Sequence, residues 1–425
     1  MSSKLQSDIK ELVKHKVISQ DVAFKIENYY QSKEPQTSNR LFTVFAVLGS
    51  TLVGLGLILI LAHNWDHFSR TIKTAFAFLP LVIGQFFVGY SILRRKSETW
   101  KEASGAFLFF AVGASMALVS QIYNIPGDLS SYLLTWVLLC LPLIYLLKSN
   151  ALALLHLIFI TCYACSFGYF TSSKTPWLYL VGLGLYLPYY IKLGKGKNIS
   201  SVLNWLTPLS LVIVLGAFID HDEQTGFLMY VVLFGLLYNI GRMPFYANEK
   251  LRRNGYLIIG SLGTVCMLLT ASFKWFWEGF FSQGYNFESQ EFVITLIFFI
   301  AASVLLVNSI IKKGVSNVNL FQVTFICFTI LFYLGLVDGS IAVILNNLFV
   351  LALGVMAVKI GADRYHLGVL NYGLLIITAL ITCRFFDTDI SFVFRGLLFV
   401  CVGAGFFLTN YIMLKKRKNN ETPKI

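Results

Sequence analysis

Polar side chains that could do chemistry gather in two short segments, each at the end of a long apolar run. The first segment is His63-Asn64-Trp65-Asp66-His67, and the second extends from Gln121 to Asp128. Convergent amide, phenol and carboxylate groups are typical of sites that bind a polar or cationic group. The sequence therefore predicts a ligand site formed by Asn64, Trp65, Asp66, Gln121, Tyr123, Asn124 and Asp128.

Two other interpretations of these segments stay open. Asn, Asp and Gly are the residues that turns require, so the segments could be loop architecture alone. Imidazole and carboxylate groups are zinc ligands, so a metal site is the third interpretation. Its candidate ligands are His63, Asp66, His67, Asp220, His221 and Asp222. The sequence has no phosphate-binding P-loop and no nucleophile motif, so we predict no catalytic residue and assign no cofactor.

The composition shows what kind of elements must position these residues. The chain has 425 residues, of which 56% are hydrophobic and 13% are charged. Soluble domains carry about 25% charged residues. An ordinary soluble enzyme is therefore excluded, and so is a nucleic-acid-binding chain, in spite of the net charge of +13.

Long apolar runs follow one another along most of the chain. A helix that spans a membrane needs roughly 20 apolar residues. The candidate spans are 42–62, 74–93, 104–123, 132–147, 151–171, 177–193, 202–219, 227–240, 256–273, 292–311, 320–337, 339–358, 367–383 and 396–414. Of these, 132–147 and 227–240 are the weakest because they are short. We predict an all-α, polytopic membrane bundle of about fourteen transmembrane helices, within a domain at 41–414.

The charged residues between the runs predict an orientation. Lysine and arginine are enriched in every second loop, as in Arg94-Arg95-Lys96 and Lys312-Lys313, and the acids are enriched in the others. Cytoplasmic loops carry the excess of basic residues. Both termini are thus predicted in the cytoplasm, with a basic tail at 415–425 that faces anionic lipid headgroups.

Tryptophan positions and the first 40 residues complete the predicted organisation. Tryptophans 65, 100, 136, 177, 205, 275 and 277 lie near predicted span ends and suggest an interfacial belt. The segment 274–291 is amphipathic and predicts a short surface or re-entrant helix. Residues 1–40 carry helical apolar faces, with Ser19 as an N-cap, and predict a cytoplasmic helical hairpin and linker. Its faces either pack on each other or dock a protein partner.

The two polar segments also carry a resemblance. Ala62-His63-Asn64-Trp65-Asp66, the run from Gln121 to Asp128 and the polar N-terminal region resemble the bacterial predicted membrane proteins of domain-of-unknown-function family 2157. The resemblance covers mainly residues 1–150. It implies an integral protein of the bacterial inner membrane, with no established activity.

Three function classes fit this organisation. The first is a transporter or flippase-like protein for a polar or lipid-linked solute, with its polar site at the extracytoplasmic face. The second is a membrane scaffold or sensor that acts through the N-terminal hairpin, and the third is an enzyme acting on lipid headgroups. Membrane lipids are the expected partners, and nucleic acid is not. A polar route through the bundle would favour the transporter over the scaffold.

Overall fold

The computed structural model consists of helices and the loops between them. It describes residues 9, 11–13, 15, 17–33, 65–171, 175–193, 198–219, 223–246, 249–280 and 289–387, and single residues within 393–411. Within these ranges there is no β-strand. The chain forms two compact units, Met1–Phe76 and Ala77–Ile425.

The described part of the first unit contains a capped amphipathic helix. Helix α2 (Gln20–Lys33) begins directly after Ser19, whose hydroxyl oxygen accepts a hydrogen bond from the Val22 N–H at 3.4 Å. This confirms Ser19 as the N-cap. The pairing of α2 into a hairpin stays a prediction, and the predicted span 42–62 lies outside the described residues.

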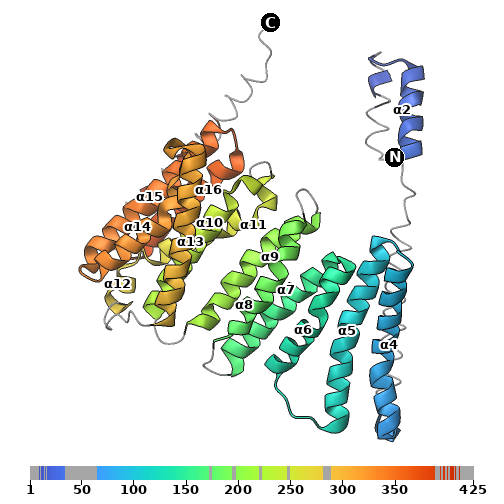
Figure 1. Cartoon of the computed structure of the whole chain (residues 1–425). Helices are drawn as coiled ribbons and strands as arrows, with labels where there is room; N and C mark the ends of the chain where they lie inside the picture. Colours follow the sequence, from blue (N-terminus) through green and yellow to red (C-terminus); the bar gives the residue numbers. More distant parts are fainter. Residues whose placement is uncertain are drawn as a thin grey trace. The chain divides into compact units, whose positions relative to one another are not determined.

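From α4 onward, every predicted span from 74–93 to 367–383 coincides with a helix (Figure 1). Nine helices of the described residues are long and apolar enough to cross a membrane, and two shorter ones, α11 and α14, are also apolar. The helices are α4 (Arg70–Leu93), α5 (Glu98–Tyr123), α6 (Leu129–Leu147), α7 (Asn150–Cys165), α8 (Trp177–Lys192), α9 (Asn198–Leu215), α10 (Glu223–Gly241), α11 (Gly255–Thr270), α12 (Lys274–Phe280), α13 (Gln290–Lys313), α14 (Leu320–Gly335), α15 (Gly339–Asp363) and α16 (Leu367–Asp387).

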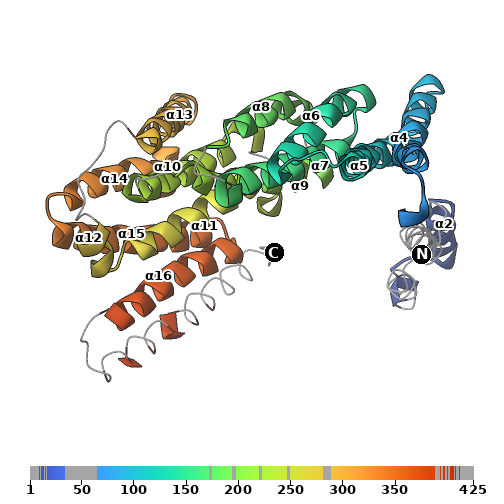
Figure 2. The ribbon, with the colours of Figure 1, turned by 90° about the horizontal axis from the view of Figure 1, so that it is seen from below.

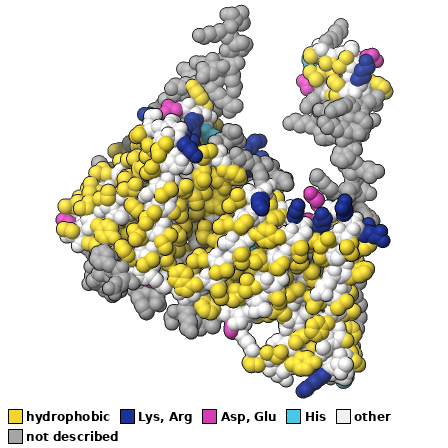
Figure 3. All heavy atoms as spheres, in the orientation of Figure 1, with side chains coloured by type: hydrophobic (Ala, Val, Ile, Leu, Met, Phe, Trp, Pro, Cys, Tyr) yellow, Lys and Arg dark blue, Asp and Glu magenta, His cyan; other side chains and the backbone are white. Residues whose placement is uncertain are grey.

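Basic residues gather at one end of these helices, which we call the basic end. Figure 3 shows lysine and arginine along this rim, above a flank covered by apolar side chains. Hydrogen bonds join neighbouring helices there; for example, Lys313 Nζ donates to the Arg242 carbonyl oxygen at 3.1 Å. Among the described lysines and arginines of this unit, only Lys274 and Arg384 belong to the other end. The basic end consists of helix termini near Arg94–Lys96, Lys148, Lys192, Arg242, Lys250–Arg253, Lys312–Lys313, Lys359 and Arg364.

Helix α10 is the central helix of this unit. It packs against α9, α11, α13 and α14 (Figure 2). Met229 and Leu233 belong to one hydrophobic cluster, whereas Leu228 and Val232 belong to a second. In the apolar stretch of this helix, 72% of the residues are buried inside the protein, a larger share than in any other candidate span of the described residues. The segment 227–240, which reads weakly as a span, is therefore a helix enclosed by other helices.

Two tryptophans correct the predicted interfacial belt. Trp136 is 8% exposed and donates from its indole N–H to the Phe109 carbonyl oxygen at 2.7 Å. Trp277 of α12 is 2% exposed and donates to the Ala271 carbonyl oxygen at 2.7 Å. Both rings pack in the core because each indole N–H finds a buried carbonyl partner. Trp100, Trp177 and Trp275 are exposed near helix starts, as an interfacial position requires.

Candidate functional site

The predicted ligand residues of the second polar segment lie at the connection between α5 and α6. Gln121 and Tyr123 are exposed in the last turn of α5. Asn124 ends that helix in the left-handed conformation, with φ of 51°, and its N–H donates to the Ser120 carbonyl oxygen. Asparagine adopts this conformation more readily than most residues. Asp128 precedes α6 as its N-cap.

The first polar segment belongs to the other compact unit. Trp65 begins the short helix η1 (Trp65–His67), and the Lys73 ammonium lies 5.7 Å from the centre of its ring. The His67 side chain is exposed. His63, Asn64, Asp220, His221, Asp222 and the side chain of Asp66 lie outside the described residues, so the complete ligand and metal sets stay predictions. Among the described residues, no group of three His, Cys, Asp or Glu side chains could hold a metal ion.

The Asp128 carboxylate accepts hydrogen bonds from the start of α6. It accepts hydrogen bonds from the Ser131 N–H at 2.8 Å, the Ser131 hydroxyl at 2.9 Å and the Ser130 hydroxyl. These donors, the Ser130 hydroxyl first, lower the pKa of Asp128 to about 2. The geometry supports helix capping at this residue.

We expect Asp128→Ala to lower the thermal stability of the detergent-solubilised protein, and Asp128→Asn to retain most of it. An asparagine oxygen still caps a helix, whereas alanine offers no acceptor. Because the pKa of Asp128 is lowered to about 2, its carboxylate is charged at pH 5 as it is at neutral pH, so the same order of stability is expected at both pH values. The melting temperatures of the three proteins, measured at neutral pH and at pH 5, check both statements. Equal destabilisation by Ala and Asn would show that the charge itself is needed.

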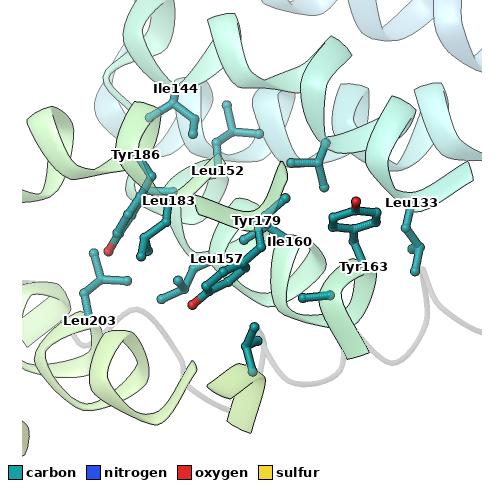
Figure 4. Packing of buried hydrophobic residues seen from close by; sticks show 14 of the residues in the cluster. Leu133, Ile144, Leu152, Leu157, Ile160, Tyr163, Tyr179, Leu183, Tyr186 and Leu203 are labelled. Carbon is teal, nitrogen blue, oxygen red and sulfur yellow. The ribbon is translucent and has the colours of Figure 1, made fainter. Parts of the chain in front are cut away.

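A second polar feature lies inside the bundle, between α8 and α9. Tyr179 is buried, and its hydroxyl is hydrogen-bonded to the Ser210 hydroxyl at 2.7 Å. Tyr186 is also buried, and its hydroxyl lies 3.4 Å from that of Thr207. Figure 4 shows both tyrosine hydroxyls directed to the same side of α8.

The hydrogen bonds between α8 and α9 continue to the basic end. The Tyr190 hydroxyl donates to the Asn204 side-chain oxygen, and the Asn204 amide donates to the Arg253 carbonyl oxygen at 3.1 Å. From Tyr179 to Tyr190 the helix rises about 17 Å at 1.5 Å per residue, which is more than half of a hydrocarbon core of about 30 Å. We call this feature the polar seam; it comprises Tyr179, Tyr186, Tyr190, Asn204, Thr207 and Ser210.

A buried histidine lies beside the seam. The His156 Nε2 atom is 3.0 Å from the Gly182 carbonyl oxygen, which can only accept, so the proton is on Nε2. The ring stacks on Tyr186 with centroids 6.2 Å apart. The His156 Nδ1 atom is buried without a hydrogen-bond partner in the described part of the chain. A buried acceptor without a hydrogen bond lowers the stability of the folded protein. A polar group of a ligand that reached this atom would therefore gain a hydrogen bond.

The seam meets an apolar groove at the end opposite the basic residues. The groove has a volume of about 430 Å³, and Tyr179 belongs to both features. Its walls come from α8, α9, η3 (Gly216–Phe218), α10 and α13. Val293 and Ile297 of α13 line it and are half-exposed, so the groove is open to the surroundings of the helices. A groove of this size and polarity suits hydrocarbon.

Sequence reasoning missed the polar seam, although a signal was present. The three tyrosines of α8 recur at intervals of seven and four residues, and the polar residues of α9 recur at intervals of three. Both spacings place the polar groups on one helical face. The apolar surroundings and the general abundance of tyrosine hid this pattern.

The comparisons with known proteins agree with the membrane architecture. No curated protein and no solved structure gives a significant match to the chain. Residues 10–153 match one family model, and this range contains helices α2 and α4 to α6 and both polar segments. The resemblance expected from the polar segments is thus confirmed: residues 10–153 match the family described as "Predicted membrane protein (DUF2157)".

Proposed function

We propose that the chain is a transporter or flippase-like membrane protein for a lipid-linked solute, and that the polar seam is its route. The observation that carries this proposal is the seam itself, a line of buried hydroxyl and amide groups along α8 and α9. In a bilayer, polar side chains inside the bundle are costly and commonly line substrate pathways. The adjoining groove would hold the apolar part of the solute while its polar group follows the seam.

The two helices of the seam have weak points that would let them separate. Pro188 lies inside α8 and Pro208 inside α9. A proline removes one helical hydrogen bond and favours a bend at that place. The seam is closed in this conformation, so transport would require α8 and α9 to move apart at these prolines.

The finer topology belongs to the same proposal. About fourteen spans, with both termini in the cytoplasm of a bacterial cell, would place the basic end at the cytoplasmic leaflet of the inner membrane. The distribution of lysine and arginine supports this orientation. The groove would then lie at the extracytoplasmic leaflet, together with Gln121, Tyr123, Asn124 and Asp128 as the proposed polar site.

Translocation of a fluorescent phospholipid tests the transporter proposal. Full-length protein is reconstituted into vesicles that contain NBD-labelled phosphatidylglycerol, and dithionite is added outside, with and without an imposed proton gradient. Dithionite bleaches only the outer leaflet of empty vesicles. We expect bleaching beyond that fraction in the presence of the protein, because lipid moves outward to the reagent.

The triple variant Tyr179→Phe, Tyr186→Phe and Tyr190→Phe should slow this movement about tenfold or more, since each lost hydrogen bond contributes about 1 kcal/mol. Tyr132→Phe is the control for a single lost hydroxyl, because it removes a partly buried hydroxyl that donates to the Gly113 carbonyl oxygen outside the seam. Equal rates for empty and protein-containing vesicles in both gradient conditions would contradict the transporter proposal. Equal slowing by the control would contradict the role of the seam.

Helix α2 favours a second function, a scaffold or sensor that docks a protein partner through residues 1–40. Val22 is 45% exposed on this helix, and Ile26, four residues later on the same face, is partly exposed. Exposed apolar side chains on a short amphipathic helix are typical of helix-in-groove recognition. Deletion of residues 1–38 would then abolish partner capture and leave lipid translocation unchanged.

A further inference from the structure

A polar pocket of about 450 Å³ lies at the basic end, between α5, α6, α7 and α8. This volume is within the usual range for small-molecule sites. None of its lining residues belongs to the groove at the opposite end or to either polar segment of the sequence. Its lining residues include Glu98, Lys101, Glu102, Lys148, Asn150, Tyr189 and Lys192.

Three lysines from three helix ends face this pocket. Lys101 is in the first turn of α5, Lys148 ends α6 and Lys192 ends α8. In the described part of the chain, none of their ammonium groups has an ion pair or a hydrogen bond. Ammonium groups without a carboxylate partner, brought together around one volume, are ready to bind an anion.

The two glutamates of the pocket do not cancel this charge. Glu102 accepts hydrogen bonds from the Asn150 N–H and the Ala151 N–H, both at 2.8 Å, and from the Ser149 hydroxyl. Its carboxylate is therefore held by the start of α7, whose helix dipole favours negative charge. The pocket thus holds three lysines against two carboxylates, Glu98 and Glu102, and keeps an excess of positive charge.

The neutral polar groups of the pocket also favour an anion. The Tyr189 hydroxyl donates to the Asn150 side-chain oxygen at 3.1 Å, which turns the asparagine amide into a donor for a ligand. The Tyr145 hydroxyl donates to the Leu185 carbonyl oxygen. These contacts use up neighbouring acceptors and leave the lysine and amide donors.

We propose that this pocket binds a phosphate group, with Lys101, Lys148 and Lys192 as its ligands. The phosphate belongs either to a lipid headgroup or to a free, soluble phosphate. The exposed Trp100 in the first turn of α5 is a typical interfacial residue and places the pocket at headgroup depth. The inference goes beyond the proposed transport, since it concerns binding alone and holds whether or not lipid moves.

Native mass spectrometry of the full-length protein distinguishes the two sources. The protein is released from two kinds of nanodisc, one of phosphatidylcholine alone and one that also contains phosphatidylglycerol. Inorganic phosphate is titrated into the sample from phosphatidylcholine alone. Selective retention of phosphatidylglycerol identifies a headgroup site. Saturable binding of inorganic phosphate without such retention identifies a soluble ligand. Retention of neither would overturn the proposal.

A charge-matched pair of variants tests the pocket itself. The pocket variant is Lys101→Gln, Lys148→Asn and Lys192→Gln; asparagine suits the left-handed conformation of residue 148. The control is Lys250→Gln, Lys312→Gln and Lys359→Gln at the same end. Affinity for the retained probe should fall on the order of 100-fold in the pocket variant and less than twofold in the control. Equal losses of affinity in the two variants would overturn the proposal. If the triple variant does not fold, Lys101→Gln alone replaces it, and its affinity is expected to fall about fivefold.

Discussion

Replacing Trp277 by alanine is expected to lower the free energy of unfolding of the second unit by about 3–5 kcal/mol. The ring is 2% exposed and packs against Gly335 of α14, where an added Cβ would lie only 2.1 Å from it. Its indole N–H also donates to the Ala271 carbonyl oxygen. Alanine would leave a cavity between α12 and the neighbouring helices and an unpaired buried carbonyl.

Trp275→Ala is the matched control for this prediction. Trp275 lies in the same short helix but is 60% exposed, so its loss should change stability little. Both variants are measured in the full-length protein by heating in detergent, followed by size-exclusion chromatography. A melting temperature of Trp277→Ala equal to that of Trp275→Ala would show that α12 rests on the surface, as the amphipathic pattern of 274–291 alone suggests.

Helix α10 shows how far hydropathy predicts the fold. Apolar length identified the segment 227–240 but ranked it among the weakest spans. Its mean hydropathy is low for a span because Gly235 and Asn239 interrupt the apolar run. In a central helix such residues are useful: Gly235 admits the Phe325 side chain, and the Asn239 amide donates to the Gln322 carbonyl oxygen at 3.0 Å. Hydropathy measures suitability for lipid, whereas protein-enclosed helices require small and hydrogen-bonding residues.

The candidate site was less predictable than the fold. The sequence indicates Gln121, Tyr123, Asn124 and Asp128 because polar residues at the end of an apolar run are conspicuous, and their role in binding stays a prediction. The polar seam requires knowledge of which helices are neighbours, since Tyr186 gains a role only when Thr207 of α9 faces it. The polar pocket with Lys101, Lys148 and Lys192 depends in the same way on the packing of α5, α6 and α8. One sequence contains the periodicity of each helix but not the pairing between helices.

The close packing of α15 and α16 provides the second large effect. A Cβ on Gly373 would lie 2.5 Å from the Val358 backbone nitrogen, and one on Gly361 would lie 2.3 Å from the Leu370 backbone nitrogen. Real Cβ atoms do not approach backbone atoms this closely, so the two helices would have to separate. Small residues at such contacts allow the backbone approach on which membrane helix association depends.

We expect Gly361→Ala and Gly373→Ala each to destabilise the protein by about 1–3 kcal/mol, and the double variant to lose the monodisperse species in detergent. Gly184→Ala is the control, because a Cβ on this glycine of α8 has no atom within 4 Å. Alanine is a better helix former than glycine by about 1 kcal/mol, so the control should be neutral or stabilised. Stabilisation by all three substitutions would mean that helix propensity dominates and that α15 and α16 are not held by backbone contact. Opposite signs for the two classes would establish that contact as the force that holds the hairpin together.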